Sequence, residues 1–179
     1  LEAALDFLPG VQTLCVDNAY EEDHADGDLG VGVAPDQLAY IYFTSGSTGE
    51  PKGAMCEHAG MLNHLHAKIA DLGIREHEVV AQVAPQCFDI SLWQLVSALL
   101  VGGRTVLVEQ DVILDVARFV DTVAAAQVNV LQVVPSYLEV VLSYLDDLAA
   151  GPVHPALPDL RCVSVTGEAL KTELAQRFF

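Results

Sequence analysis

The sequence predicts an α/β fold in which a mainly parallel sheet carries helices on both of its faces. Two observations lead to this prediction. Short apolar runs alternate with segments of helical spacing along the chain, which is the pattern of strands joined by covering helices. The composition is that of a folded domain, because 52% of the 179 residues are hydrophobic and 18% are charged.

The first half of the chain is expected to contain three strands and one helix. Residues 13–16 form a short apolar run, which an acidic loop over residues 17–37 follows. A second strand is expected at residues 38–43. Residues 58–70 are predicted to be helical, because apolar side chains recur there at helical spacing. Residues 79–84 are apolar and end at a proline, so we expect a buried strand.

The next segment continues the alternation. Residues 90–100 are predicted to be helical and to end at the Gly102-Gly103 pair. A strand is expected at residues 105–108. Valines at helical spacing over residues 116–123 then mark one face of a further helix.

The last part of the chain repeats this order once more. A strand is expected at residues 130–134. Ser136 and Glu139 are expected to form a capping box for a helix that runs to Leu148. A connection rich in glycine and proline leads to the last strand, at residues 160–165. Ligands of parallel sheets bind at the carboxyl ends of the strands, where we expect Thr44, Gln132 and Thr166 to lie.

The loop over residues 44–53 is the most informative stretch of the chain. Its glycines let backbone amides approach phosphate oxygens, its hydroxyls can donate hydrogen bonds and its lysine adds positive charge. The spacing is not that of a Walker loop, because Pro51 precedes the lysine and Gly53 follows it. A flexible Gly/Ser turn is the alternative interpretation. The residues expected to bind phosphate are Thr44, Ser45, Gly46, Ser47, Thr48, Gly49 and Lys52.

Three motifs carry a family resemblance. Residues 40–53 (YIYFTSGSTGEPKG) resemble the phosphate-loop signature of adenylate-forming enzymes, the superfamily of acyl-CoA synthetases, luciferases and adenylation domains of nonribosomal peptide synthetases. Residues 88–93 (FDISLW) and 163–170 (VSVTGEAL) are similar to motifs of the peptide-synthetase branch. The resemblance implies that residues 1–179 belong to the large N-terminal subdomain of such an enzyme, and we expect the chain to be truncated at both ends.

The resemblance also implies an amino acid pocket. Asp89 matches the aspartate that pairs with the substrate's α-ammonium group through a charge-assisted contact. Its position ahead of a helix also suits an N-cap, and the two roles are compatible. The matching pocket walls are Ile90, Trp93, Gln132, Ser164 and Thr166, for each of which ordinary packing is the alternative. Their mixture of polar groups with a bulky indole favours a polar or modest-sized substrate side chain.

Gly167 and Glu168 match the loop that shapes the nucleotide pocket, although Glu168 also suits a helix N-terminus. The implied reaction joins an amino acid to ATP and passes the acyl group to phosphopantetheine on a carrier protein. Carrier and condensation domains are the implied partners. The catalytic lysine and the Mg²⁺ ligand of the family are expected beyond Phe179, so we expect no catalytic residue in the chain and no turnover from it alone.

Charge and cysteine usage restrict the remaining possibilities. The net charge of −17, with only eight scattered Lys and Arg residues, argues against nucleic acid as a partner. The four cysteines lack Cys-x-x-Cys spacing, so we expect reduced thiols in a cytoplasmic protein and no metal site. No segment has the length of a membrane span. The alternatives to amino acid activation are an acyl- or aryl-CoA ligase and a catalytically silent nucleotide-binding module.

Overall fold

The computed structural model describes residues 27–44, 49–148 and 156–178. The chain divides into two units, Leu1–Val33 and Ala34–Phe179. Only residues 27–33 of the first unit are described, and they form no helix or strand. The strand predicted at residues 13–16 and the first part of the acidic loop therefore lie outside the described residues. The second unit carries the architecture described below.

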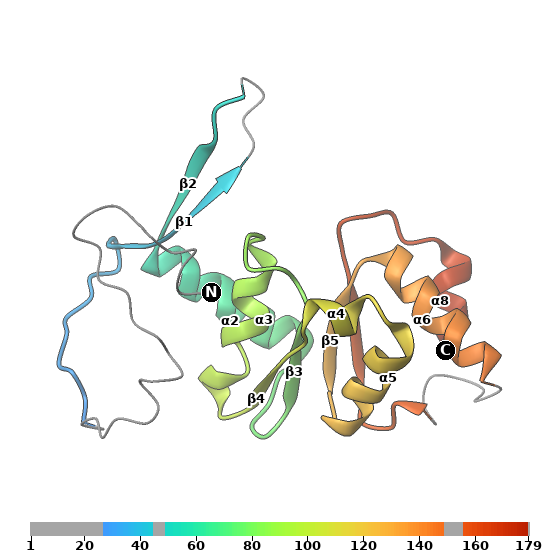
Figure 1. The fold of residues 1–179 in the computed structure, drawn as a ribbon. Coiled ribbons are helices and arrows are strands. Elements are labelled where there is room, and N and C mark those ends of the chain that lie inside the picture. Colours follow the sequence, from blue (N-terminus) through green and yellow to red (C-terminus); the bar gives the residue numbers. More distant parts are fainter. Residues whose placement is uncertain (1–26, 45–48, 149–155, 179) are drawn as a thin grey trace, which may run out of the picture. The chain divides into compact units, whose positions relative to one another are not determined.

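Four strands form a parallel sheet in the second unit (Figure 1). They lie in the order β4-β3-β5-β6, and each neighbouring pair is parallel. The strands are β3 (Val79–Gln82), β4 (Arg104–Leu107), β5 (Val130–Val133) and β6 (Cys162–Val165). The predicted parallel sheet is confirmed, with β3, β5 and β6 one or two residues shorter than the apolar runs suggested and β4 shifted by one residue.

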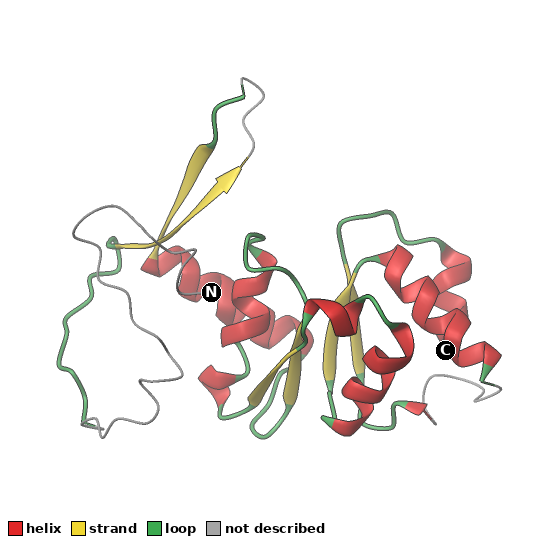
Figure 2. Cartoon of the chain, in the orientation of Figure 1, coloured by secondary structure: helices red, strands yellow, loops and turns green. Residues whose placement is uncertain are grey.

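Helices separate the strands along the chain (Figure 2). They are α2 (His58–Leu72), α3 (Ile90–Val96), α4 (Gln110–Ile113), α5 (Val116–Ala125), α6 (Pro135–Asp147) and α8 (Thr172–Phe178), with a 3₁₀ turn η2 at Leu99–Val101. The helix predicted over residues 90–100 is split, because α3 ends at Val96 and η2 completes the segment before Gly102. None of the described helices has the length and hydrophobicity needed to cross a bilayer.

A separate hairpin corrects one prediction. β1 (Leu38–Thr44) and β2 (Lys52–Glu57) form an antiparallel two-stranded sheet of their own, so the strand predicted at residues 38–43 does not belong to the parallel sheet. Two strands joined by a short loop pair with each other in antiparallel fashion, whereas a parallel partner requires a long crossover. The sequence KGAMCE of β2 lacks the apolar pattern that would have predicted this partner.

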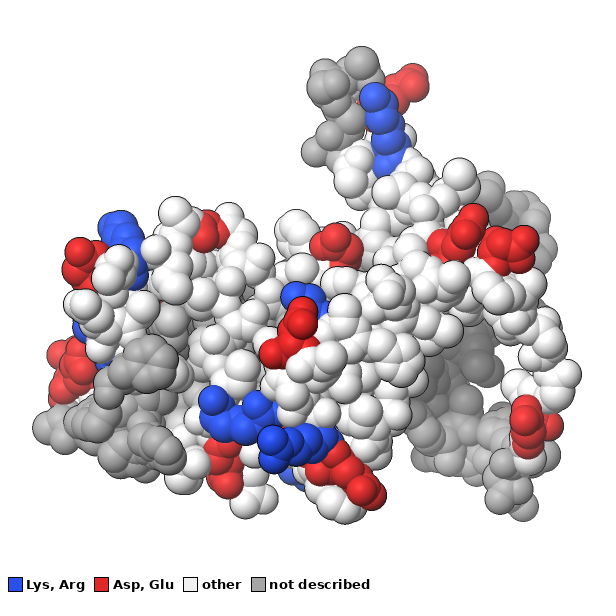
Figure 3. All heavy atoms as spheres, turned by 180° about the vertical axis from the view of Figure 1, so that it is seen from behind, with Lys and Arg blue, Asp and Glu red and all other residues white. Residues whose placement is uncertain are grey.

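Three of the eight Lys and Arg side chains form ion pairs with described acidic side chains. On the face shown in Figure 3, a short row of blue groups in the lower part adjoins red groups. Three pairs are close enough for ion pairing: Arg161 with Glu78, Arg118 with Asp111 and Arg177 with Asp146. These three arginines are therefore each paired locally with a carboxylate.

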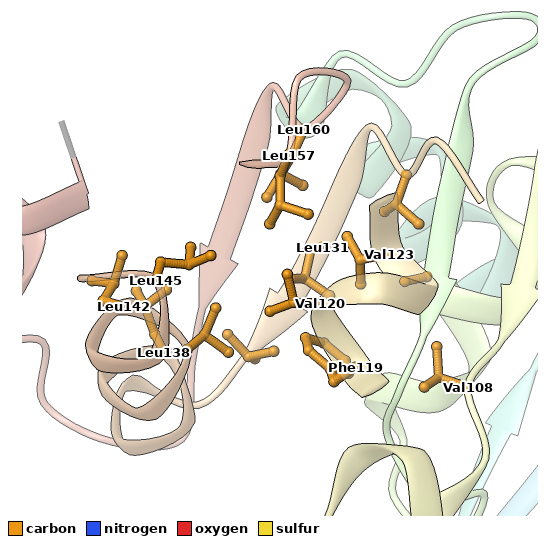
Figure 4. Close-up of a cluster of buried hydrophobic side chains, with 14 of the residues drawn as sticks. Val108, Phe119, Val120, Val123, Leu131, Leu138, Leu142, Leu145, Leu157 and Leu160 are labelled. Atoms are coloured by element: carbon orange, nitrogen blue, oxygen red, sulfur yellow. The ribbon is translucent and has the colours of Figure 1, made fainter. Parts of the chain in front are cut away.

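Both faces of the parallel sheet are buried. On one face, Val80 and Val130 pack with Leu65 of α2 and Trp93 of α3. On the other, alternate strand residues such as Leu131 pack against helices α5 and α6, whose side chains Figure 4 shows converging on the strands. Because strand side chains alternate in direction, this division confirms that helices cover both faces. Each fully buried aliphatic side chain stabilises the fold by about 1.5–3 kcal/mol.

Candidate functional site

A cavity of about 420 Å³ opens at the carboxyl end of the parallel sheet. Residues that end or follow β3, β5 and β6 line it, together with side chains of α3 and α6. The lining residues are Val83, Ala84, Pro85, Phe88, Ile90, Gln94, Ile113, Gln132, Val133, Val134, Tyr137, Thr166 and Gly167. We call this space the sheet-end cavity. It brings together Ile90, Gln132, Thr166 and Gly167 from the predicted site.

Gln132 supplies a polar group to the wall of this cavity. The residue lies in β5 and is only 3% exposed, since the sheet and the covering helices enclose the strand. Its Oε1 atom is buried and accepts no hydrogen bond from any described residue. Leaving a buried acceptor unpaired is costly, so this oxygen is a destabilising feature of the core.

Gln94 is a second buried amide, and sequence reasoning did not single it out. Its Oε1 accepts hydrogen bonds from the backbone amides of Val83 and Ala84, at 3.0 and 2.9 Å. These bonds hold the chain where it leaves β3. Its Nε2 is buried and has no partner within the described ranges. Gln94 lies one helical turn after Ile90, but Trp93 at i+3 is an equally close neighbour, so spacing alone did not single out Gln94.

Trp93 and Ser164 lie apart from the other predicted pocket residues. Trp93 is completely buried between α2 and the sheet, and it lines neither cavity described here. The Nζ atom of Lys68 lies over the indole ring, 5.6 Å from its centroid, and makes a cation–π contact with it. Ser164 sits within β6 and lines neither cavity. Packing against α2 holds the indole in the core, whereas the neighbouring Gln94 is among the residues around the sheet-end cavity.

A second cavity of about 470 Å³ lies between the hairpin and the segment that precedes α3. Hairpin residues line one side and residues 87–89 line the other. Its lining consists of Tyr40, Tyr42, Phe43, Thr44, Ala54, Met55, Cys56, Cys87, Phe88 and Asp89. We call it the hairpin cavity. Phe88 lines both cavities, so the two spaces are neighbours.

Asp89 faces the hairpin cavity with an uncommitted carboxylate. Although it immediately precedes α3, its side chain makes no cap hydrogen bond, and its φ of −59° and ψ of −29° are helical. A capping side chain requires extended backbone at this position. The predicted capping role is therefore absent. The carboxylate has no hydrogen bond or ion pair with any of the described residues and remains exposed.

Two tyrosines on the hairpin border the same cavity. Tyr40 and Tyr42 meet edge to face, with ring centroids 5.2 Å apart, and the Tyr42 hydroxyl lies 3.4 Å from Ser91 Oγ. A hydrogen bond with Cys56, together with partial burial, raises the pKa of Tyr40 to about 12. The Tyr40 phenol therefore stays protonated at neutral pH, and both tyrosines line the hairpin cavity.

The predicted phosphate loop closes this hairpin. Residues Ser45, Gly46, Ser47 and Thr48 lie outside the described ranges. Thr44 and Lys52 face each other across the hairpin, and Thr44 Oγ1 donates to the Lys52 carbonyl at 3.4 Å. The Lys52 side chain is exposed and makes no ion pair with any described residue. Gly53 allows the strands to approach closely here, because a Cβ atom would stand 2.9 Å from Ile41 Cγ2.

Glu168 ties the loop after β6 to the start of α6. Its Oε2 accepts from the Ser136 amide at 3.0 Å, and its Oε1 accepts from Ser136 Oγ at 2.9 Å. The capping box predicted within α6 is wrong, because the helix already begins at Pro135 and Glu168 takes the capping role. Gly167, with φ of +84°, makes the turn that brings Glu168 there.

Comparison with known proteins decides the family. The family model described as "AMP-binding enzyme" matches residues 2–179. The chain belongs to this family. It is 35% identical to indigoidine synthase of Dickeya dadantii over 94% of this chain, and 34% identical to tyrocidine synthase 3 of Brevibacillus parabrevis over 87%. The predicted resemblance to peptide-synthetase adenylation domains is thereby confirmed.

A solved structure is similar to this AMP-binding enzyme chain in its fold. A four-domain nonribosomal peptide synthetase bound to AMP and glycine matches with a TM-score of 0.64 and 29% identity, over 79% of this chain and 10% of that chain. The chain spans 11% and 2% of the lengths of the two sequence relatives. Its predicted fold, the sheet-and-helix core of an adenylate-forming enzyme, is confirmed.

The described residues of this AMP-binding enzyme chain offer no cluster of three or more His, Cys, Asp or Glu side chains that could hold a metal ion. Cys56, Cys87 and Cys162 are free thiols. Tyr137, at the wall of the sheet-end cavity, donates to the Ile113 carbonyl at 2.6 Å, and burial raises its pKa to about 12. Its hydroxyl is therefore already committed, unlike the two unpaired amide groups.

Proposed function

We propose that the protein activates an amino acid as an aminoacyl adenylate, using ATP, for loading onto the phosphopantetheine thiol of a carrier protein in nonribosomal peptide synthesis. One observation carries the proposal. Thr44, at the edge of the phosphate loop, and the unpaired carboxylate of Asp89 line one cavity, and Phe88 lines both that cavity and the sheet-end cavity. This adjacency supports assigning the phosphates and the ammonium group to the hairpin cavity and the substrate side chain to the sheet-end cavity.

Each part of the substrate finds a chemically suitable partner in this arrangement. Asp89 binds the α-ammonium group, since an unpaired carboxylate in a cavity favours a cation. Ile90, Gln132 and Thr166 surround the substrate side chain. Trp93 and Ser164 support the pocket from the core and from β6. The ATP phosphates lie along Thr44, Ser45, Gly46, Ser47, Thr48, Gly49 and Lys52, and Gly167 and Glu168 border the nucleotide.

In the first step the amino acid carboxylate attacks the α-phosphorus of ATP, a phosphoanhydride bond breaks and pyrophosphate leaves. In the second, the carrier thiol loses its proton and attacks the acyl carbon, and AMP leaves. The residues of this chain position the reactants and offset charge, which is the main source of rate enhancement in phosphoryl and acyl transfer. Because no described cluster can hold a metal, we assign no ligand for Mg²⁺ here. Carrier and condensation domains are the proposed partners.

ATP–pyrophosphate exchange in the full-length protein tests the proposal. We expect exchange with amino acids and none with the matching deaminated acids. Asp89→Ala should abolish most exchange, because the ammonium group then enters the cavity without its carboxylate. Asp121→Ala is the matched control, since Asp121 is an exposed aspartate on α5 that lines neither cavity.

Two results would contradict the proposal. Equal exchange with a deaminated analogue would assign the protein to the acyl- or aryl-CoA ligases, which have no ammonium group to bind. No exchange with any acid, in a protein that binds ATP, would favour a silent nucleotide-binding module.

A further inference from the structure

A side chain from the first turn of α3 holds the turn that carries Asp89. The hydroxyl of Ser91 donates to the Phe88 carbonyl at 2.7 Å, and the Gln86 carbonyl lies 3.5 Å from the same oxygen. The Ser91 amide also donates to the Phe88 carbonyl, at 3.0 Å. Two donors of one residue therefore fix the peptide group that joins Phe88 to Asp89.

Ser91 belongs to the core and not to the walls of the cavities. It is 6% exposed and lines neither the sheet-end cavity nor the hairpin cavity. Asp89, two residues earlier, does line the hairpin cavity, and its side chain makes no cap hydrogen bond to α3. Because no such bond holds the carboxylate, its place in the cavity depends on the backbone of the turn, which Ser91 fixes.

The same hydroxyl also contacts the hairpin. The Tyr42 hydroxyl lies 3.4 Å from Ser91 Oγ. A serine hydroxyl has a single proton, and the 2.7 Å bond to the Phe88 carbonyl uses it, so the phenol is the donor to Ser91. At 3.4 Å this contact is longer than a strong O–H···O bond, and we expect it to contribute less than the bond to Phe88.

The hairpin side of this contact leads directly into the phosphate loop. Tyr42 and Thr44 are two residues apart in β1, so they share one face of the strand, and both line the hairpin cavity. Tyr40 lies on the same face. A hydrogen bond with Cys56 and burial are the larger causes of its raised pKa, and the charge of Asp89 adds to them, as expected for a carboxylate near the hairpin.

We infer that Ser91 is a positioning residue, which holds Asp89 at the hairpin cavity through the Phe88 carbonyl and connects the turn to β1 by accepting a hydrogen bond from Tyr42. The inference rests on the proposed function, because it concerns how the ammonium partner of that site is held. Ser91 itself does not contact the substrate, and its effect passes through the backbone ahead of Asp89.

The test is ATP–pyrophosphate exchange with the full-length protein. The wild type is first assayed with each proteinogenic amino acid, and the variants are then compared on the amino acid that gives the fastest exchange. Ser91→Ala should raise the KM for this amino acid about three- to tenfold, the contribution of one neutral hydrogen bond, and kcat should stay within about twofold. A change that only loosened the fold would reduce the amount of active protein, and so lower kcat without raising KM.

Ser97→Ala is the matched control. Ser97 follows α3, is completely buried and lines neither cavity, as Ser91 does, but its hydroxyl has no hydrogen-bond partner among the described residues. Removing it therefore takes a buried hydroxyl away without releasing the turn. Neither KM nor kcat should change by more than about twofold.

Tyr42→Phe examines the connection to the hairpin. It should raise the KM for the amino acid by about two- to threefold, less than Ser91→Ala, because the contact that it removes is longer. The double variant should match Ser91→Ala alone, since residues that act through one contact are not additive. A further increase in the double variant would mean that Tyr42 acts on the substrate directly, which would overturn the connection through Ser91.

The outcomes distinguish this inference from the proposed function. If the wild type supports exchange and Ser91→Ala leaves the KM unchanged, or Ser97→Ala raises it equally, the inference is overturned and amino acid activation stands. Absence of exchange with every amino acid would remove the proposed function, and the inference with it. If Ser91→Ala failed to fold, Tyr42→Phe would decide, and an unchanged KM in that variant would overturn the inference.

Discussion

The elements that line the two cavities differ in how deeply they are buried. All four residues of β5, which carries Gln132, are buried, and helices pack on both faces of its sheet. The hairpin that forms the wall of the other cavity exposes most of its length, including Phe43 at 69% and Met55 at 74%. The difference teaches that the proposed side-chain pocket is built on the core, whereas the proposed phosphate loop joins strands that have little packing of their own.

A pair of phenylalanines gives the largest expected contrast. Phe119 is 1% exposed and meets Tyr137 edge to face at 5.1 Å, so Phe119→Ala should lower the free energy of unfolding by about 3–5 kcal/mol through lost burial and a cavity. Phe43→Ala removes the same atoms from an exposed strand and should change the free energy of unfolding by less than about 0.5 kcal/mol. Urea denaturation followed by circular dichroism measures both.

The comparison would break if the two substitutions cost the same. A large effect of Phe43→Ala would mean that the hairpin is packed against something that its exposure in the described residues does not reveal. A small effect of Phe119→Ala would mean that the core repacks without loss.

Arg161 gives the next largest effect, because it joins three elements. Its guanidinium donates to both carboxylate oxygens of Glu78, at 2.5 and 2.6 Å, and to the carbonyls of Leu72 and Gly73 at the end of α2. Arg161→Met should cost about 1–3 kcal/mol at neutral pH, the range for hydrogen bonds to charged groups. Arg118→Met is the control, since its partner Asp111 is exposed and the urea midpoint should barely move.

The same pair predicts a pH dependence. The hydrogen bonds from Arg161 hold the pKa of Glu78 below its ordinary value of 4.5. A depressed carboxylate pKa stabilises the fold above the pKa of the unfolded state, and this stabilisation is lost as the pH falls through the folded pKa. The difference between wild type and Arg161→Met should therefore be full near neutral pH and shrink below pH 4.5. An equal difference at about pH 3 would show that ion pairing is not its cause.

Glu168 is expected to have a smaller effect on stability and a larger one on activity. Glu168→Gln removes the charge at the α6 N-terminus and should cost about 0.5–1 kcal/mol. Ser136→Ala removes the hydroxyl that donates to Glu168. The double variant should cost less than the sum of the two, because the residues share one interaction. If the loop also borders the nucleotide, exchange activity should fall in Glu168→Gln beyond what the unfolded fraction explains.

Regular patterns in the sequence were enough to predict the parallel sheet and part of the site. Gln132 and Thr166 were predicted correctly to lie at the carboxyl end of the sheet. The end of an apolar run in the sequence marks where a buried strand ends, so the residues at that point could be identified. The hairpin was missed because KGAMCE has no apolar alternation. β2 forms because it pairs with the nearby β1 strand, and the residues of β2 alone do not reveal this pairing.

Side-chain direction within a predicted helix could not be read from spacing. Trp93 and Gln94 are adjacent, and either could have faced the cavity after Ile90. Packing of the indole against Leu65 and the sheet decides the matter, and this contact joins residues far apart in the sequence. The role of Glu168 was also hidden, because its partner Ser136 lies 32 residues earlier and was itself expected to cap its own helix.

Lys52 provides the last and smallest expected change in stability. Its side chain is exposed and unpaired among the described residues, so Lys52→Ala should alter the free energy of unfolding by less than about 0.5 kcal/mol. If the loop binds ATP phosphates, the KM for ATP should nevertheless rise about tenfold, the loss of one charge-assisted contact, with the KM for the amino acid nearly unchanged. Lys171→Ala, at an exposed lysine outside both cavities, should change neither constant. Equal increases in both KM values would mean that the hairpin acts on the whole site and that the two cavities are not separate in function.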